Sequence, residues 1–176
     1  AGGIAFGEGR RMMPDTQTLP RPTADTPAKA GLWFLGCRVH IAMAQADNPD
    51  GISLIEHRMP YGSAPPQHVH HDEDEIFHIL EGEMEFELGG ERFVRRAGDT
   101  LIGPRGVPHR FRVLSPGGVR LLTISRGGFE DMIRATSRPA PGPGLPEQRA
   151  PTPEEQQALA TACAARGIDI VGPPLA

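Results

Sequence analysis

The sequence predicts an all-β protein, a small antiparallel barrel or sandwich, with short helices near its C-terminus. Short apolar runs alternate with turn-forming stretches over residues 32–125, which is the pattern expected of such folds. The 176 residues include 22 glycines and 19 prolines, a content that favours turns over long helices. This length suits one domain with a full hydrophobic core.

The clearest local prediction is a β-hairpin. In residues 83–88 apolar side chains alternate with glutamates, so we expect the apolar set inside and the glutamates in water. Gly89-Gly90 follows as a two-residue turn, a common connection between antiparallel strands. The resulting register places Glu87 opposite Arg92, where opposite charges stabilise the pair.

We divide the chain into three parts. Residues 1–30 have no hydrophobic periodicity and are expected to form an irregular N-terminal arm. Residues 31–127 hold the predicted strands, and residues 128–176 form an extension with short helices and a proline-rich linker.

Two helices are expected in the C-terminal extension. Phe129–Arg134 predicts a short helical piece. Thr152-Pro153-Glu154-Glu155 combines a capping threonine, a proline at the first helical position and a glutamate three residues after the cap. The second helix should run to about Arg166 and stop at Gly167.

Composition excludes several classes of partner. The net charge of −4 argues against nucleic acid as the main partner. No apolar run approaches the roughly 20 residues that span a bilayer, and the N-terminus lacks the apolar core of a signal peptide. The two cysteines, Cys37 and Cys163, form no disulfide framework. We therefore expect a cytoplasmic protein without membrane association.

One polar stretch concentrates groups that bind metals. His68 and His70 are two residues apart, so in a strand both imidazoles leave the same face. Glu75 lies five residues beyond His70, which is the wrong parity for one continuous strand. If residues 71–74 form a solvated turn, His70 ends one strand and Glu75 begins the next as its neighbour.

A fourth candidate ligand, His109, follows about thirty residues later, after a second stretch rich in glycine and proline. Three imidazoles and one carboxylate suit one divalent transition metal, namely Fe, Mn, Co, Ni, Cu or Zn. Four protein ligands leave one or two coordination positions open, as catalytic sites require. We expect apolar surroundings from Met59, Phe77, Ile79, Phe86 and Phe111.

The two stretches resemble the two motifs of the cupin superfamily. Gly62, His68, His70, Glu75 and Gly82 match the first motif, and Gly98, Pro104, Gly106 and His109 match the second. The asparagine that ends the second motif is replaced by Val113, but that asparagine is not a metal ligand. The resemblance covers about residues 33–127 and implies the cupin jelly roll, a double-stranded β-helix barrel with the metal inside.

Within the superfamily, the run from Pro65 to Glu75 is similar to single-domain quercetin 2,3-dioxygenases. That resemblance implies a flavonol-like aromatic substrate and O2, with Glu75 as a general base that deprotonates the enolic hydroxyl. The heterocycle would then open with loss of carbon monoxide. A homodimer is also expected, because an aperiodic 30-residue arm stays ordered more easily against a partner.

Two other functions fit the same residues. The first is a non-redox, metal-dependent cyclase or isomerase acting on a polyketide or a sugar. The second is a non-catalytic cupin that binds a small molecule through its metal and an apolar pocket. The sequence contains neither a phosphate-binding glycine loop between strand and helix nor a Gly-X-Ser-X-Gly motif, so nucleotide chemistry and serine hydrolysis are unsupported.

Overall fold

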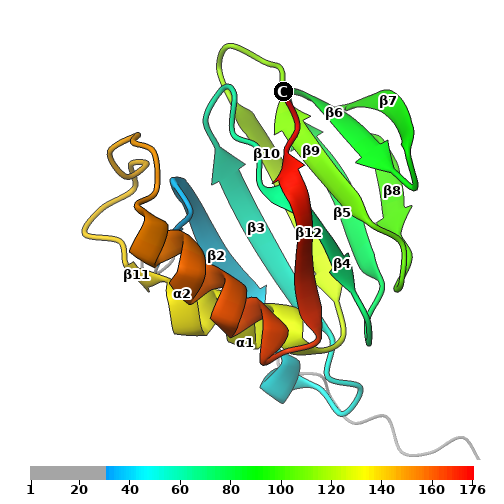
Figure 1. Cartoon of the computed structure of the whole chain (residues 1–176). Helices are drawn as coiled ribbons and strands as arrows, with labels where there is room; N and C mark the ends of the chain where they lie inside the picture. The colour runs from blue at the N-terminus through cyan, green and yellow to red at the C-terminus, as the bar shows by residue number, and fades with distance from the viewer. Residues whose placement is uncertain (1–30) are drawn as a thin grey trace, which may run out of the picture.

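The computed structural model describes residues 31–176, and two antiparallel sheets dominate it (Figure 1). The predicted arm, residues 1–30, lies outside the described residues. The seven-stranded sheet has the order β11-β1-β2-β3-β10-β5-β8. Its strands are β11 (Arg138–Pro139), β1 (Leu32–Phe34), β2 (Cys37–Met43), β3 (Ser53–Met59), β10 (Val119–Ser125), β5 (Glu75–Glu81) and β8 (Thr100–Gly103).

The second sheet has five strands in the order β12-β4-β9-β6-β7. They are β12 (Ile168–Pro174), β4 (Pro66–His70), β9 (His109–Val113), β6 (Glu83–Leu88) and β7 (Glu91–Arg96). The sheets face each other without closing into a continuous barrel, in the arrangement of a jelly roll. The predicted antiparallel all-β fold is confirmed.

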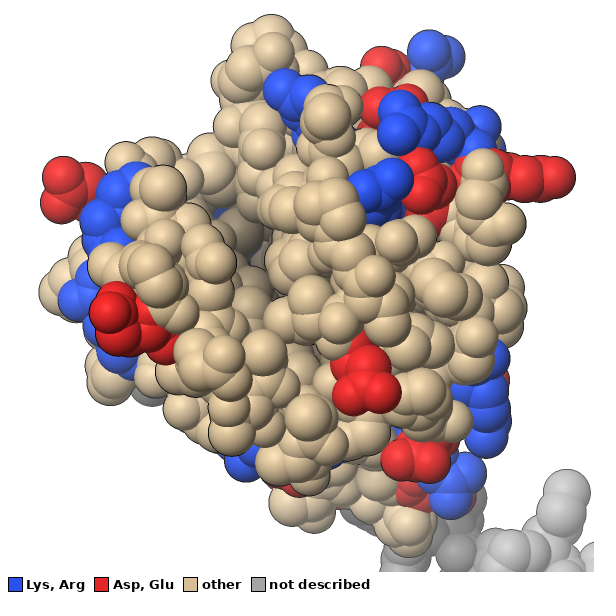
Figure 2. All heavy atoms as spheres, viewed as in Figure 1, with Lys and Arg blue, Asp and Glu red and all other residues tan. Residues whose placement is uncertain are grey.

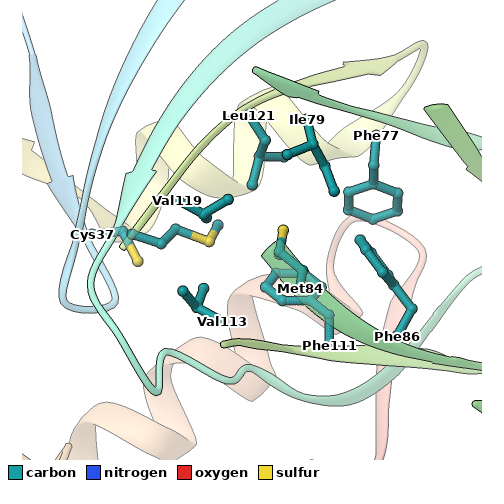
Figure 3. Close-up of a cluster of buried hydrophobic side chains, with 10 residues drawn as sticks. Cys37, Phe77, Ile79, Met84, Phe86, Phe111, Val113, Val119 and Leu121 are labelled. Atoms are coloured by element: carbon teal, nitrogen blue, oxygen red, sulfur yellow. The ribbon is translucent and has the colours of Figure 1, made fainter. Parts of the chain in front are cut away.

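The main core lies between the two sheets, where inward side chains from both meet (Figure 3). Strands β3, β5 and β10 contribute from one side, and β6 and β9 from the other. The five apolar residues expected around the site, Met59, Phe77, Ile79, Phe86 and Phe111, all belong to this buried cluster. They are packed core, and among them only Phe77 makes a ring contact with a candidate ligand, His109, at 6.0 Å.

The β6–β7 hairpin forms as predicted, with Glu87 opposite Arg92 in the register. The glutamates of β6 do not all face water, however. Glu87 is only 8% exposed, because Arg92 from β7 and Arg110 from β9 both donate to its carboxylate at 2.8 Å. Figure 2 shows the charged side chains gathered at this end of the five-stranded sheet, over β6 and β7.

Two helices cover the lower end of the seven-stranded sheet, α1 (Gly128–Thr136) and α2 (Pro153–Ala164). Thr152 caps α2 as predicted, since its hydroxyl accepts from the backbone N–H of Glu155 at 3.2 Å. A second buried cluster joins both helices to the sheets through Phe34, Val39, Ile55, Phe129, Met132, Ile133, Leu159, Cys163 and Ile168. Within residues 31–176 neither helix has the length and hydropathy that a membrane span requires.

Candidate metal centre

Three strands place the four candidate ligands. His68 and His70 lie on β4, Glu75 is the first residue of β5, and His109 is the first residue of β9. Strands β4 and β9 pair at His68 and His109, which puts these rings side by side. Residues 71–74 turn the chain between β4 and β5, so Glu75 returns beside His70.

The structure brings all four predicted ligands together, with one ligand atom from each within 4.8 Å of the others. The ring centroids of His68 and His109 are 4.5 Å apart, and those of His70 and His109 are 5.5 Å apart. Gly103 on β8 makes room for this packing, because a Cβ there would lie 3.3 Å from the Cε1 atom of His109.

Three of the four ligands are fully buried. His70, Glu75 and His109 are 1%, 2% and 2% exposed, whereas His68 is only partly buried. His68 is therefore the most accessible of the four ligands.

Hydrogen bonds at Nδ1 fix the tautomers of the three histidines. The Nδ1 atoms of His68 and His109 lie 2.9 Å and 3.1 Å from the carbonyl oxygens of Pro66 and Val107. The Nδ1 atom of His70 lies 3.2 Å from a carboxylate oxygen of Glu73. These oxygens only accept hydrogen bonds, so each Nδ1 carries a proton, and a ring in its neutral form then presents the lone pair of Nε2.

When the rings are neutral, these Nε2 lone pairs face the carboxylate of Glu75, which also has no proton to offer. Oε2 of Glu75 lies 3.3 Å from Nε2 of His109 and 3.4 Å from Nε2 of His70. The Nε2 atom of His70 is buried and has no hydrogen-bond partner. A group of acceptors in a buried site needs a cation among them, and the imidazole and carboxylate donors fit a transition metal.

The protonation states also favour metal binding. Burial lowers the pKa of His68 to about 4, assisted by the charges of His109 and His70. Burial alone would raise the pKa of Glu75, but the hydrogen bond of His109 and the charges of the histidines lower it to about 2. At neutral pH His68 is therefore neutral and Glu75 is ionised, the forms in which both coordinate metals.

Proton competition is expected at His70. Burial lowers its pKa, but the hydrogen bond to Glu73 and the charges of Glu75 and Glu73 outweigh this effect, so the pKa is raised. A proton on the Nε2 atom of His70 occupies the position that a metal would take, and metal affinity should fall as the pH is lowered.

Glu73 corrects our interpretation of the turn before Glu75. We expected residues 71–74 to be solvated, but Glu73 is only 3% exposed and bonds to His70. The rest of the turn fits the expectation better, since His71 is exposed and contacts Asp169 rather than the cluster. Asp72, Glu73 and Asp74 are consecutive acids, and the sequence offers one signal that separates Glu73 from its neighbours. Glu73 lies three residues after His70, close enough along the chain to contact its side chain.

One further histidine lies near the site. His57 on β3 is 1% exposed, and its Nε2 atom lies 2.9 Å from the hydroxyl of Thr123. The ring of Phe129 lies 6.2 Å from that of His57 and 5.6 Å from that of His70. Phe129, the second residue of α1, thus packs between the two histidines.

Comparisons with known proteins agree with the cupin resemblance. The protein-family model of the cupin domain matches residues 55–125. Quercetin 2,3-dioxygenase of Bacillus subtilis is 43% identical over 54 residues, 31% of this chain and 16% of that enzyme. An uncharacterized protein of Methanocaldococcus jannaschii is 34% identical over 73 residues, 42% of this chain and 58% of that protein.

Among solved structures, a predicted oxalate decarboxylase from Thermotoga maritima is 22% identical and has a TM-score of 0.49. The likeness covers 51% of this chain and 79% of that chain. The matches to the curated relatives span less than two thirds of either relative. The family model thus identifies residues 55–125 as similar to a cupin domain, and the jelly-roll arrangement of the two sheets agrees with that match.

Proposed function

We propose that this protein is a metal-dependent dioxygenase that acts on a flavonol-like enolic aromatic substrate with O2. His68, His70, Glu75 and His109 would hold one divalent transition metal. Such a metal supplies Lewis acidity towards an enolic oxygen and a path for electrons between the substrate and O2. The partial match to quercetin 2,3-dioxygenase supports this substrate class.

One observation carries the proposal, namely the convergence of three imidazoles and one carboxylate, with one ligand atom of each within 4.8 Å of the others. Purely structural metal sites are closed by their protein ligands, whereas these four ligands would leave one or two positions open on a five- or six-coordinate ion. The packed core beside the cluster excludes water from it.

Glu75 has the position required of a general base. Its carboxylate is ionised at neutral pH and lies in the centre of the cluster. A substrate whose enolic oxygen occupies the open position would bring its hydroxyl proton within reach of Glu75, which would accept it. Burial then holds the resulting enolate away from bulk water.

The test is elemental analysis of the protein purified without added metal, followed by a flavonol bleaching assay under air and under nitrogen. We expect about one bound transition metal per chain and bleaching that requires air. Metal-dependent turnover that continues under nitrogen would replace the dioxygenase with a cyclase or isomerase. Tight binding of a small molecule without turnover under either gas would identify a non-catalytic binding protein.

A further inference from the structure

We propose that Glu73 is a positioning residue of the metal centre, which orients His70 through the hydrogen bond at its Nδ1 atom. This inference rests on the metal centre proposed above. It assigns a role to a residue that is not one of the matched positions of either cupin motif and that lies in the turn between β4 and β5.

The geometry of Glu73 is that of a carboxylate built into the interior. Its side chain is 2% exposed, and that of its partner His70 is 1% exposed. Gly127, which precedes α1, leaves the space that the carboxylate fills, since a Cβ at Gly127 would lie 3.0 Å from Oε2 of Glu73. The turn and the helix N-terminus therefore enclose Glu73 against the back of His70.

The other two histidines lack such a partner. His68 and His109 each donate from Nδ1 to a backbone carbonyl two residues earlier in the chain. His70 alone donates to a carboxylate, a stronger acceptor that makes the imidazole a more basic ligand and fixes its tautomer. Glu73 thus distinguishes His70 from the other imidazoles.

The burial of Glu73 points to the same role. Its carboxyl group lies in the interior, in contact with a ligand of the proposed metal. Within residues 31–176 the only ion-pair contact shown for Glu73 is the one to His70, and the Oε2 atom of Glu73 has no hydrogen-bond partner. A cation bound at Nε2 of His70 would polarise the imidazole and strengthen its hydrogen bond to Glu73.

A purely structural role for Glu73 makes a different prediction. If the carboxylate only stabilises the turn, its loss should lower the melting temperature of the metal-free protein and leave metal affinity unchanged. If it positions His70, its loss should weaken metal binding and change the spectrum of the bound ion.

The experiment titrates the metal-free full-length protein with Co²⁺ and follows the visible absorption of the bound ion. We expect Glu73→Gln to raise the Kd for Co²⁺ by about 10- to 100-fold relative to wild type and to shift the visible band. Asp72→Asn is the matched control, because Asp72 is exposed in the same turn and its loss should change neither quantity.

Unchanged affinity and spectrum in Glu73→Gln, with normal Co²⁺ binding by wild type, would overturn the role of Glu73 and leave the metal centre intact. Failure of wild type to bind Co²⁺ or Zn²⁺ would overturn both. If Glu73→Gln does not fold, NMR of the Zn²⁺-loaded wild type with ¹⁵N-labelled histidine decides. We expect the Nδ1 proton of His70 downfield of those of His68 and His109, and equal shifts would contradict the proposal.

Discussion

Glu75 is the only carboxylate among the four converging ligands, and two roles for it can be separated. As a ligand it contributes an oxygen and a negative charge to the buried cluster. As a base it must also accept a proton from the substrate. A glutamine at this position keeps an oxygen donor of the same reach but accepts no proton, so it tests the second role alone.

For Glu75→Gln we expect metal to remain measurable while turnover per bound metal falls by about 10²- to 10⁴-fold, the range for a lost general base. The measurement is the rate on the best flavonol divided by metal content. His109→Ala provides the contrast, because it should lose metal first and activity as a consequence. Equal rates per metal in Glu75→Gln and wild type would reduce Glu75 to a plain ligand.

At the scale of single residues, spacing predicted the cluster because strand parity decides which side chains share a face. The positions of His68, His70, Glu75 and His109 follow from this rule and from one turn. The burial of Glu73 could not be predicted in the same way. It depends on α1, some fifty residues later, whose preceding Gly127 admits the carboxylate.

At the scale of secondary structure, strand β12 supports the strand that carries two ligands. β12 pairs with β4 so that Ile168 lies opposite His70 and Ile170 opposite His68. Ile168 is 2% exposed and belongs to the cluster that includes residues of both helices. The last strand therefore connects the helical extension to the metal centre.

For Ile168→Ala we expect the free energy of unfolding to fall by about 2–5 kcal/mol, because the change leaves a cavity in a packed cluster. Val171→Ala on the same strand is the control. Val171 is 50% exposed, and its truncation should change stability by about 0.5 kcal/mol or less. Urea unfolding of both variants measures the difference, and equal losses would show that β12 does not carry the core contact.

The helices and the hairpin were predictable because local signals specify them, namely the cap at Thr152 and the turn at Gly89-Gly90. Strand β12 was not predicted. It ends in Pro173 and Pro174, and prolines usually argue against a strand. They are tolerated here because β12 lies at the edge of its sheet. Its pairing depends on contacts with β4, about a hundred residues away in the chain.

At the scale of the whole molecule, buried histidines make the metal-free protein sensitive to acid. Burial lowers the pKa of His57 from 6.5 to about 4, against the opposing charges of Glu75 and Glu56. Above pH 6.5 His57 is neutral in both the folded and the unfolded chain and contributes no pH dependence. Between pH 6.5 and 4 only the unfolded chain binds the proton, so stability falls.

We expect His57 to contribute a loss of about 3 kcal/mol in the free energy of unfolding over this pH window. His57→Gln keeps a hydrogen-bond donor for Thr123 but does not titrate. Its unfolding free energy should therefore fall less steeply than that of wild type between pH 6.5 and 4, while the two proteins should have the same slope above pH 7. Denaturant unfolding of the metal-free proteins at several pH values gives the slopes, and parallel slopes would contradict the assignment to His57.

The assembly of the molecule remains a prediction, as do its cytoplasmic location and its three-part division. We expect a homodimer in which the arm of residues 1–30 or an outer sheet face makes the contact. Light scattering at micromolar concentration should give twice the chain mass of 18.9 kDa. A mass of one chain under these conditions would show that the protein works as a monomer.

The pairing of β12 with β4 implies that metal binding at β4 should change the dynamics of β12. The backbone N–H of His71 donates to the carbonyl of Gly167 at 2.8 Å. This hydrogen bond joins the chain just after β4 to the chain just before β12. An ion held by His68 and His70 restrains β4, and β12 cannot detach without losing that restrained partner. Amide deuterium uptake in residues 168–174 should therefore slow when metal is added. Mass spectrometry of the C-terminal peptide would then measure how much of the metal site is occupied.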